Sequence, residues 1–367
     1  MKTGYNFDAE TIGAMRKKNK PVMVYGSGNF ALNVLDYLKS VGADVRGFLV
    51  DDKYYSEGMT LGGENVVPLG GVKSLDDYSI AIGFCNVPKS RFIMDNASII
   101  KGDYYFLWQT SDEPWWPPEY MEEHEGDFLA IERELADSRS RDVLRALIRA
   151  NVNRDYREIV PYVDEHQYFN RLTFVHDASA EVLVDCGAYS GDTIAGFSDF
   201  TDGRYAHIYS FEPNVDNLKM MNENIGDRYH DVTVIKKGTW SKECVLEFMK
   251  QGSGSSIKGA MSVNDGGDVI RVPVVALDEA LGDVPVTFIK MDIEGSELET
   301  LRGARDIIRR NMPRLAVCCY HKPTDIIDLY GCMKSFENEE KKYIFYLRQY
   351  SFNNTETVMY AIPVDKR

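Results

Sequence analysis

Short apolar segments alternate with helical segments through the second half of the chain, and each apolar segment ends in a polar or glycine-containing loop. These apolar segments are Val182–Cys186, His207–Phe211, Val232–Ile235, Thr287–Met291 and Arg314–Cys319. Continuous apolar runs of this length, with amphipathic helices between them, predict parallel strands that are buried on both faces. Tyr343–Leu347 and Thr357–Ile362 follow, joined by a turn-prone Ser-Phe-Asn-Asn segment. We therefore expect an alternating α/β sheet that a hairpin closes at one edge.

The first part of the chain predicts a smaller sheet of the same kind. Pro21–Tyr25 is a short apolar run that stops at a glycine, and apolar residues then recur at helical spacing. Val45–Val50 and Ile80–Phe84 predict two further strands. The sequence therefore predicts two Rossmann-like α/β domains, which we place at residues 1–108 and 181–367.

A segment of different composition connects the two predicted domains. Ser111–Pro118 contains two tryptophans and three prolines, and prolines cannot continue a helix or a central strand. Phe128–Ile148 carries apolar residues among many charged ones, as expected of an amphipathic helix that packs on another element. We assign residues 109–180 to a helical bridge.

The charge and the cysteines narrow the class of protein. Lys and Arg number 42 against 57 Asp and Glu, a net charge of −15, which argues against charge-driven binding to nucleic acid or anionic lipid. No apolar run approaches the length of a membrane span, and Met1–Lys20 has no signal-peptide core. The six cysteines include no Cys-x-x-Cys pair, which favours buried thiols over disulfides or a zinc site. We expect a cytoplasmic protein, and a homo-oligomer is compatible with these features.

A glycine loop follows the first strand of the second domain. Its sequence, Asp-Cys-Gly-Ala-Tyr-Ser-Gly-Asp-Thr, occupies residues 185–193. Gly187 permits a tight turn, and Gly191 would let the backbone approach a ligand. Asp185 and Asp192 would repel a phosphate but attract a ligand that carries an amino group. Taken alone, the loop also fits an ordinary strand-to-helix turn without a ligand.

A carboxylate ends the next strand, in the sequence Phe-Glu-Pro-Asn at residues 211–214. Glu212 lies about 25 residues beyond the glycines, the spacing at which an acid binds a ribose diol in nucleotide-binding folds. An isolated glutamate here would be a surface residue. Together with the glycine loop, it predicts a nucleoside site.

Three further carboxylates lie at the carboxyl end of the fourth strand, in the sequence Lys-Met-Asp-Ile-Glu-Gly-Ser-Glu at residues 290–297. Acids this close repel one another unless a cationic ligand, the neighbouring lysine, a divalent metal or a helix N-terminus lies close. We assign Asp292 and Glu294 to the candidate site and Glu297 to the start of the following helix.

These motifs together resemble the FkbM family of S-adenosylmethionine-dependent methyltransferases. The resemblance extends from about Ala180 to the C-terminus, and the run at 290–297 is its most specific part. It implies a class I methyltransferase sheet and S-adenosylmethionine as cofactor. Family members are linked mainly to O-methylation of sugars and natural products. We therefore expect an O-methyltransferase that acts on a hydroxyl of a sugar, nucleotide-sugar or glycan precursor.

The resemblance also assigns parts of the cofactor to particular residues of this chain. Asp185, Gly187 and Gly191 would hold the methionine part, Glu212 the ribose, and Gly238, Thr239 and Trp240 would lie near the adenine. Ala188, Thr193, Pro213 and Asn214 complete the expected cofactor-binding set.

A histidine ends the fifth strand, in the sequence Cys-Tyr-His-Lys-Pro at residues 319–323. Because parallel strands end at one edge of a sheet, His321 should lie near Asp292 and Glu294, and we take these three as the candidate catalytic residues. Two roles fit His321: a general base for a sugar hydroxyl, or a metal ligand together with Asp292 or Glu294. A histidine that caps the next helix near Thr324 is the non-functional alternative.

The first domain carries a second candidate site. The sequence Gly-Ser-Gly-Asn-Phe-Ala from Gly26, with Asp51 at the end of the next strand, fits the dinucleotide fingerprint. We assign Gly26, Gly28, Asn29 and Asp51 to this site. A nucleotide-sugar oxidoreductase or epimerase is therefore the competing function, and a non-catalytic binding protein is the third. The domain is also similar to the small N-terminal domains of bacterial sugar acyltransferases, which implies a nucleotide-linked sugar as its ligand.

Overall fold

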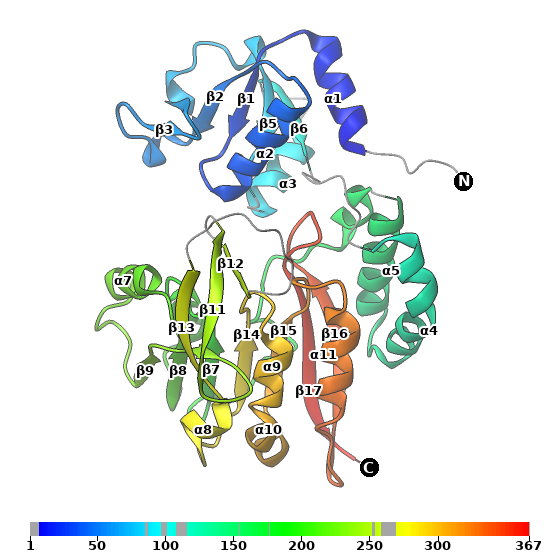
Figure 1. Cartoon of the computed structure of the whole chain (residues 1–367), viewed down its shortest axis with the longest axis vertical. Coiled ribbons are helices and arrows are strands. Elements are labelled where there is room, and N and C mark those ends of the chain that lie inside the picture. The colour runs from blue at the N-terminus through cyan, green and yellow to red at the C-terminus, as the bar shows by residue number, and fades with distance from the viewer. Residues whose placement is uncertain are drawn as a thin grey trace. The chain divides into compact units, whose positions relative to one another are not determined.

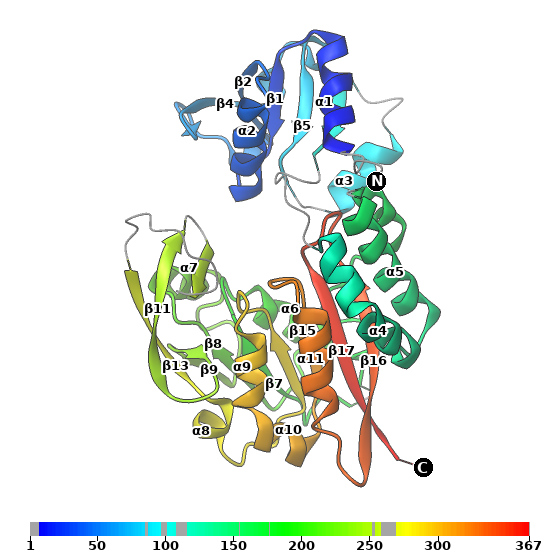
Figure 2. The ribbon, with the colours of Figure 1, turned by 45° about the vertical axis from the view of Figure 1, so that its right-hand side comes forward.

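The chain divides into two compact units, each built around its own sheet (Figures 1 and 2). The computed structural model describes residues 7–84, 87–96, 101–107, 116–153, 155–175, 177–251, 254–257 and 269–366. Unit 1 comprises Met1–Glu123, Arg145–Glu165 and Ser351–Asn354, and unit 2 comprises His124–Leu144, His166–Tyr350 and Thr355–Arg367. The expected domain boundary at residue 108 and most of the proline-tryptophan run lie outside the described residues. Among the described residues, no helix is long and apolar enough to cross a membrane.

The sheet of unit 1 has the strand order β3-β4-β2-β1-β5-β6. Its strands are β1 (Val22–Tyr25), β2 (Val45–Val50), β3 (Thr60–Leu61), β4 (Glu64–Pro68), β5 (Ser79–Ile82) and β6 (Asp103–Phe106). All neighbouring strands are parallel except β3 and β4, so the three strands predicted from the sequence lie together in a Rossmann-like sheet.

Helices α1 (Phe7–Lys18), α2 (Asn29–Ser40) and α3 (Val87–Asp95) accompany this sheet, with short 3-10 turns at Asp52–Tyr54, Leu69–Gly71 and Leu75–Asp77. The sequence predicted α2, which buries Val34, Leu35 and Leu38 in one cluster with Val24 and Phe48. It did not predict α1.

The expected helical bridge contains two helices, α4 (Pro118–Glu134) and α5 (Ser138–Asn153), followed by 3-10 turns at Tyr156–Glu158 and Val160–Tyr162. In the short connection between the two helices, the backbone N–H of Ala136 donates to the carbonyl of Phe345, 2.9 Å away. Asp137 then pairs with Arg348 at 2.6 Å, and its side chain also accepts a hydrogen bond from the N–H of Ser140, at 2.8 Å. These contacts attach the bridge to an edge strand of unit 2.

The main sheet of unit 2 has the strand order β16-β17-β15-β14-β7-β8-β9. The strands are β7 (Val182–Cys186), β8 (His207–Phe211), β9 (Val232–Ile235), β14 (Phe288–Met291), β15 (Arg314–Cys318), β16 (Lys341–Gln349) and β17 (Thr357–Asp365). The five strands from β15 to β9 are parallel, and β17 is antiparallel to both of its neighbours. The predicted α/β sheet with a terminal hairpin is confirmed.

The helices of unit 2 lie on the two faces of this sheet. They are α6 (Asp192–Thr201), α7 (Val215–Asn224), α8 (Leu277–Leu281), α9 (Glu297–Arg302), α10 (Arg305–Asn311) and α11 (Asp325–Lys334). Ile194 and Phe197 of α6 share a core cluster with Leu183 and Phe288 of the strands. Right-handed connections place α9, α10 and α11 on the opposite face, where Figure 1 shows them in front of the sheet.

A second, four-stranded sheet in unit 2 was not predicted from the sequence. It contains β10 (Gly238–Thr239), β11 (Cys244–Gln251), β12 (Gly254–Ile257) and β13 (Val269–Val275), in the order β10-β13-β11-β12. β10 pairs in parallel with the end of β13. This sheet carries the residues that the sequence analysis expected near an adenine.

Candidate functional site

The glycine loop after β7 lies against the ends of two neighbouring strands. The backbone N–H groups of Gly187 and Ala188 donate to the carbonyl of Phe211, at 3.0 and 3.1 Å. Gly187 has a φ of +87°, and a side chain there would overlap the carbonyl oxygen of Asp292 at the end of β14. The loop can therefore reach this position only because residue 187 is glycine.

Gly191, the second glycine of the loop, is required by packing within the protein. Gly191 has a φ of +82°, and a Cβ there would lie 2.8 Å from Ile225 and 3.0 Å from Met221. Packing against α7 therefore accounts for this glycine without an approaching ligand. The neighbouring Ala188 and Thr193 are buried, at 0% and 5% exposure.

A fully buried ion pair joins the ends of β7 and β14. The Asp185 carboxylate lies 3.1 Å from the Lys290 ammonium, and the two side chains are 0% and 4% exposed. Lys290 also donates to the carbonyl of Gly187, at 2.8 Å. Burial raises the pKa of Asp185, although the ammonium acts against this shift. The pair therefore fixes the start of the glycine loop to the neighbouring strand.

Glu212 lies at the end of β8 and faces the glycine loop. Its carboxylate accepts hydrogen bonds from the N–H of Tyr189 (2.9 Å), the N–H of Asn214 (2.8 Å) and the amide of Asn217 (3.2 Å). The side chain is buried, and burial raises its pKa despite these donors. Since a carboxylate has about four acceptor positions, this one keeps capacity for another donor while its orientation is fixed.

The remaining residues of the expected cofactor set follow on from Glu212. Asn214 caps α7, because its side chain accepts from the N–H groups of Asp216 and Asn217. A Cβ on Gly238 would lie 3.6 Å from the ring of Pro213, so β10 runs beside this loop. Thr239 is buried and accepts a hydrogen bond from Thr300, at 2.9 Å, and the N–H of Trp240 donates to Val275.

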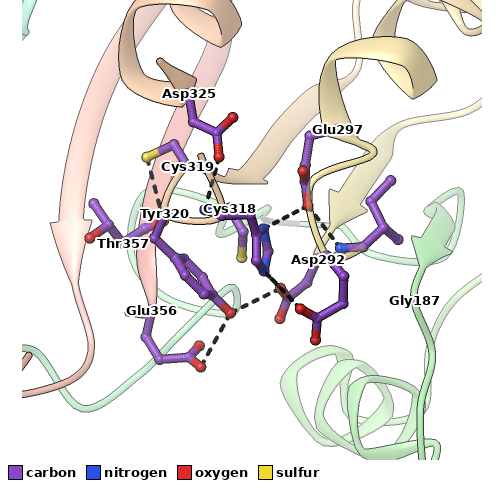
Figure 3. Close-up of polar contacts among 12 residues, drawn as sticks. Gly187, Asp292, Glu297, Cys318, Cys319, Tyr320, Asp325, Glu356 and Thr357 are labelled. Carbon is purple, nitrogen blue, oxygen red and sulfur yellow. Dashed lines mark hydrogen bonds and ion pairs between the residues drawn. The ribbon is translucent and has the colours of Figure 1, made fainter. Parts of the chain in front are cut away.

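A second group of polar side chains surrounds His321, beyond the ends of β14 and β15. Figure 3 shows Asp292, Glu297 and Asp325 of this group. The Nδ1 atom of its ring lies 3.0 Å from Oε1 of Glu297. The Nε2 atom lies 3.5 Å from Asp292 and 3.8 Å from Glu294. The structure thus brings together the three candidate catalytic residues, and it adds Glu297, whose Oε1 also accepts from the N–H of Ile293 at 2.9 Å.

Two tyrosines hold the carboxylate of Asp292 from the other side. The hydroxyl of Tyr168 donates to Oδ2 at 3.0 Å, and the hydroxyl of Tyr320 donates to Oδ1 at 3.1 Å. Tyr320 also donates to Glu356, at 3.3 Å, and Figure 3 shows Asp292, Tyr320 and Glu356 in this row. Although burial opposes ionisation, Lys290 and the hydrogen-bond donors hold the pKa of Asp292 below its usual value.

The carboxylates around His321 determine its protonation. Burial lowers the pKa of the imidazole, but Glu297, Asp292 and Glu294 together raise it to about 9. Asp325, whose carboxylate accepts from the N–H groups of His321 and Lys322, has its pKa raised to about 7 by burial and by Glu297. With only these groups present, His321 is an imidazolium at neutral pH and gives its positive charge to a strongly acidic site.

Part of the chain matches a known family of enzymes. Residues 185–352 match the methyltransferase FkbM domain. This segment therefore resembles the FkbM methyltransferase domain. The matched residues include the glycine loop, Glu212, Asp292 and His321. The predicted class of enzyme, a methyltransferase, is confirmed, while the role of each residue remains a proposal.

Solved structures resemble the FkbM methyltransferase fold of this chain. The crystal structure of a methyltransferase FkbM from Methylobacillus flagellatus is 21% identical, has a TM-score of 0.62, and the match covers 98% of this chain and 94% of that one. A putative methyltransferase from Streptococcus mutans in complex with SAH is 11% identical, with a TM-score of 0.35 and coverage of 51% and 90%. The first match supports the fold along nearly the whole chain. The second has too low a TM-score to support a conclusion about this chain. No curated protein matches the chain.

Two residues of the group around His321 were not predicted from the sequence. Glu297 begins α9, as predicted, but its side chain is also 1% exposed and lies against His321, which was not predicted. The sequence of residues 290–297 alone does not indicate that the side chain of Glu297 contacts a histidine. Tyr168 comes from the expected bridge, 124 residues before Asp292. No local pattern predicts a contact over such a separation.

The candidate site of unit 1 lies at the ends of β1 and β2. Asp51 accepts hydrogen bonds from the hydroxyl of Tyr25, at 2.5 Å, and from the ammonium of Lys89, at 2.7 and 2.8 Å. Burial acts to raise the pKa of Asp51, but these donors lower it below its usual value. Gly28 precedes α2 without a side-chain cap, and Asn29 is exposed. A ribose diol would have to compete with Lys89 for the carboxylate.

Proposed function

We propose that the chain is an S-adenosylmethionine-dependent O-methyltransferase whose acceptor is a hydroxyl of a sugar, nucleotide-sugar or glycan precursor. The observation that carries the cofactor assignment is the buried Glu212 carboxylate, held by Tyr189 of the glycine loop at the end of β8. Ligands of open α/β sheets bind beyond the carboxyl ends of the strands, where this carboxylate and the loop lie. Glu212 would accept hydrogen bonds from the ribose, and Gly238 and Trp240 would flank the adenine.

The charge of the site supports a cationic cofactor. Asp292, Glu294 and Glu297 lie around one histidine, while the nearby Lys290 is paired with Asp185. Bound S-adenosylmethionine supplies a methyl group on a positively charged sulfur, which leaves as a neutral thioether. Fixed carboxylates favour binding of the charged form over the neutral product.

The surroundings of Asp292 support a hydroxyl-rich acceptor. The hydroxyls of Tyr168 and Tyr320, the carboxylate of Glu356 and the amide of Gln167 form a connected row of donors and acceptors. A sugar presents hydroxyls that can exchange hydrogen bonds with such groups, whereas an apolar acceptor would offer them no further partner. In the proposed reaction these residues align the acceptor oxygen, and its proton passes to a carboxylate of Asp292 or Glu294, because the imidazolium of His321 is already protonated.

The first test is calorimetric titration of the purified protein with S-adenosylhomocysteine. We expect binding by the wild type and a loss of affinity of about 10- to 100-fold in Glu212→Ala, because charge-assisted hydrogen bonds to the ribose disappear. Glu223→Ala, which removes an exposed glutamate of α7, is the matched control and should bind normally. Folded wild-type protein that does not bind would contradict the proposal.

The second test separates chemistry from cofactor binding. His321→Ala should bind S-adenosylhomocysteine like the wild type, while turnover with sugars and nucleotide-sugars as acceptors falls by about 10²- to 10⁴-fold. His230→Ala, which changes an exposed histidine paired with Asp231, should keep full activity. A His321→Ala enzyme with normal turnover would remove this residue from the mechanism.

A nucleotide-sugar oxidoreductase or epimerase that uses Gly26, Gly28, Asn29 and Asp51 is the second candidate. It predicts binding of NAD, and a non-catalytic binding protein predicts binding of neither cofactor. The engagement of Asp51 by Lys89 and Tyr25 counts against the dinucleotide, since it occupies the oxygens that a ribose needs.

A further inference from the structure

We infer that Asp292, Glu294 and Nε2 of His321 form a binding site for one divalent metal ion beside the acceptor. The ion's role in methyl transfer rests on the proposed function, but its binding does not.

The imidazole of His321 is held in one orientation. Its Nδ1 atom lies 3.0 Å from Glu297, and this carboxylate is fixed in turn by the backbone N–H of Ile293 at 2.9 Å. The side chain of Glu297 is only 1% exposed, so it cannot turn towards solvent. Histidines that bind metals commonly donate their second ring N–H to a carboxylate, which fixes the ring and increases its basicity. Glu297 is placed for this supporting role.

The Nε2 atom of the ring, like Nδ1, has no hydrogen bond among the described residues, although the side chain is only 8% exposed. Instead it faces two carboxylate oxygens at 3.5 Å (Asp292) and 3.8 Å (Glu294). These separations are too long for hydrogen bonds. Two ligand atoms that each lie about 2.1 Å from one ion are about 3.0 to 3.4 Å apart in octahedral or tetrahedral coordination. Glu294 is 69% exposed and is free to close the small remaining difference.

Asp292 is supported in the way that a metal-binding carboxylate usually is. Tyr168 and Tyr320 each donate to one of its oxygens, so its plane is fixed while one side faces His321. Donor atoms of Asp292, Glu297 and His321 all lie within 4.8 Å of one another, and Glu294 joins this cluster through its 3.8 Å contact with His321. Hydrogen bonds to the ligating groups are a regular feature of metal sites.

The local charge also favours a cation. Asp292, Glu294 and Glu297 contact His321, and Glu356 and Asp325 lie directly behind them through Tyr320 and the backbone of His321. Lys322 donates to the carbonyl of Gly295 rather than to these acids. Three carboxylates therefore contact one imidazole and two more lie behind them, an excess of acid that a divalent ion would reduce.

The donor set identifies the kind of ion. Two carboxylates and one imidazole suit Mn²⁺ or Zn²⁺ better than Mg²⁺ or Ca²⁺, which prefer oxygen donors alone. Three protein ligands leave coordination positions open, and a hydroxyl oxygen of the acceptor would take one of them. The ion would then hold that oxygen in place and favour the loss of its proton.

Mn²⁺ alone is a suitable probe, since electron paramagnetic resonance measures the free ion directly. We expect chelator-treated full-length protein, without S-adenosylmethionine, to bind one Mn²⁺ per chain. Asp292→Asn and His321→Gln should each weaken binding by more than about 10-fold, and Glu297→Gln by about 10- to 100-fold through its loss of support for the ring. Asp231→Asn, in the exposed pair with His230, should leave binding unchanged.

Two measurements keep this inference separate from the proposed function. The same variants are titrated with S-adenosylhomocysteine in metal-free buffer, where near-normal binding shows that they remain folded. Absence of stoichiometric Mn²⁺ binding by the wild type, or equal binding by the wild type and Asp292→Asn, overturns the metal site even if the cofactor binds. Conversely, Mn²⁺ binding without any affinity for S-adenosylhomocysteine supports the site and contradicts only the proposed function.

Discussion

Lys290→Met is expected to destabilise unit 2 by about 3–5 kcal/mol, the usual cost of removing one partner of a buried ion pair. The Asp185 carboxylate is 0% exposed and has no other charged partner within ion-pair distance among the described residues. The substitution would therefore leave a buried charge without compensation, and it would also remove the hydrogen bond to the carbonyl of Gly187. Urea denaturation followed by circular dichroism measures the loss.

Lys237→Met is the matched control for this experiment. Lys237 pairs with Glu243 at 2.5 Å, but the side chains are 35% and 62% exposed, so the expected loss is below about 1 kcal/mol. Adding Asp185→Asn to Lys290→Met should restore part of the stability, because the stranded charge is gone. Equal losses in the two lysine variants would show that burial of the Asp185–Lys290 pair is unimportant.

Gly187→Ala is expected to lower the free energy of unfolding by about 2–4 kcal/mol and to abolish binding of S-adenosylhomocysteine. The φ of +87° is unfavourable for alanine, and the new methyl group would overlap the carbonyl oxygen of Asp292. The loop must then move away from β14, which displaces the N–H of Tyr189 from Glu212. Denaturation and calorimetry on the same sample measure both effects.

Gly203→Ala separates the two causes. Gly203 also has a positive φ, of +67°, but a Cβ there would meet nothing within 4 Å. We expect it to cost only about 1–2 kcal/mol for the backbone and to leave binding intact. If the free energy of unfolding falls equally in both alanine variants, the overlap with Asp292 does not contribute to the loss of stability.

The main sheet of unit 2 could be predicted almost to the residue because its central strands are buried on both faces. Val182–Cys186 and His207–Phe211 are apolar runs with clear ends, and the observed β7 and β8 coincide with them. The second sheet lacks such a pattern. Val245 in β11 is 60% exposed, so this strand presents no continuous apolar run. Helix α1 buries Ile12 and Met15 within a largely polar sequence, which conceals it.

The candidate site could be predicted as far as topology determines it. Parallel strands end at one edge, so Asp292 and His321 had to lie close, and the structure brings them within 3.5 Å. What could not be predicted depends on side-chain packing between distant segments. Which ring nitrogen faces Glu297, and which tyrosines reach Asp292, follow from the three-dimensional packing of residues that share no local pattern.

The origin of Tyr168 has a practical consequence for how this enzyme can be shortened. Tyr168 and Phe169 precede β7, yet the first donates a hydrogen bond to Asp292 and the second packs its ring 6.0 Å from that of Phe288. A truncated protein that starts at residue 181 keeps every strand of the main sheet but loses Tyr168, one wall of the candidate site. A shortened enzyme meant to stay active must therefore begin before residue 166, and fusions that exchange the first domain need their junction upstream of that point.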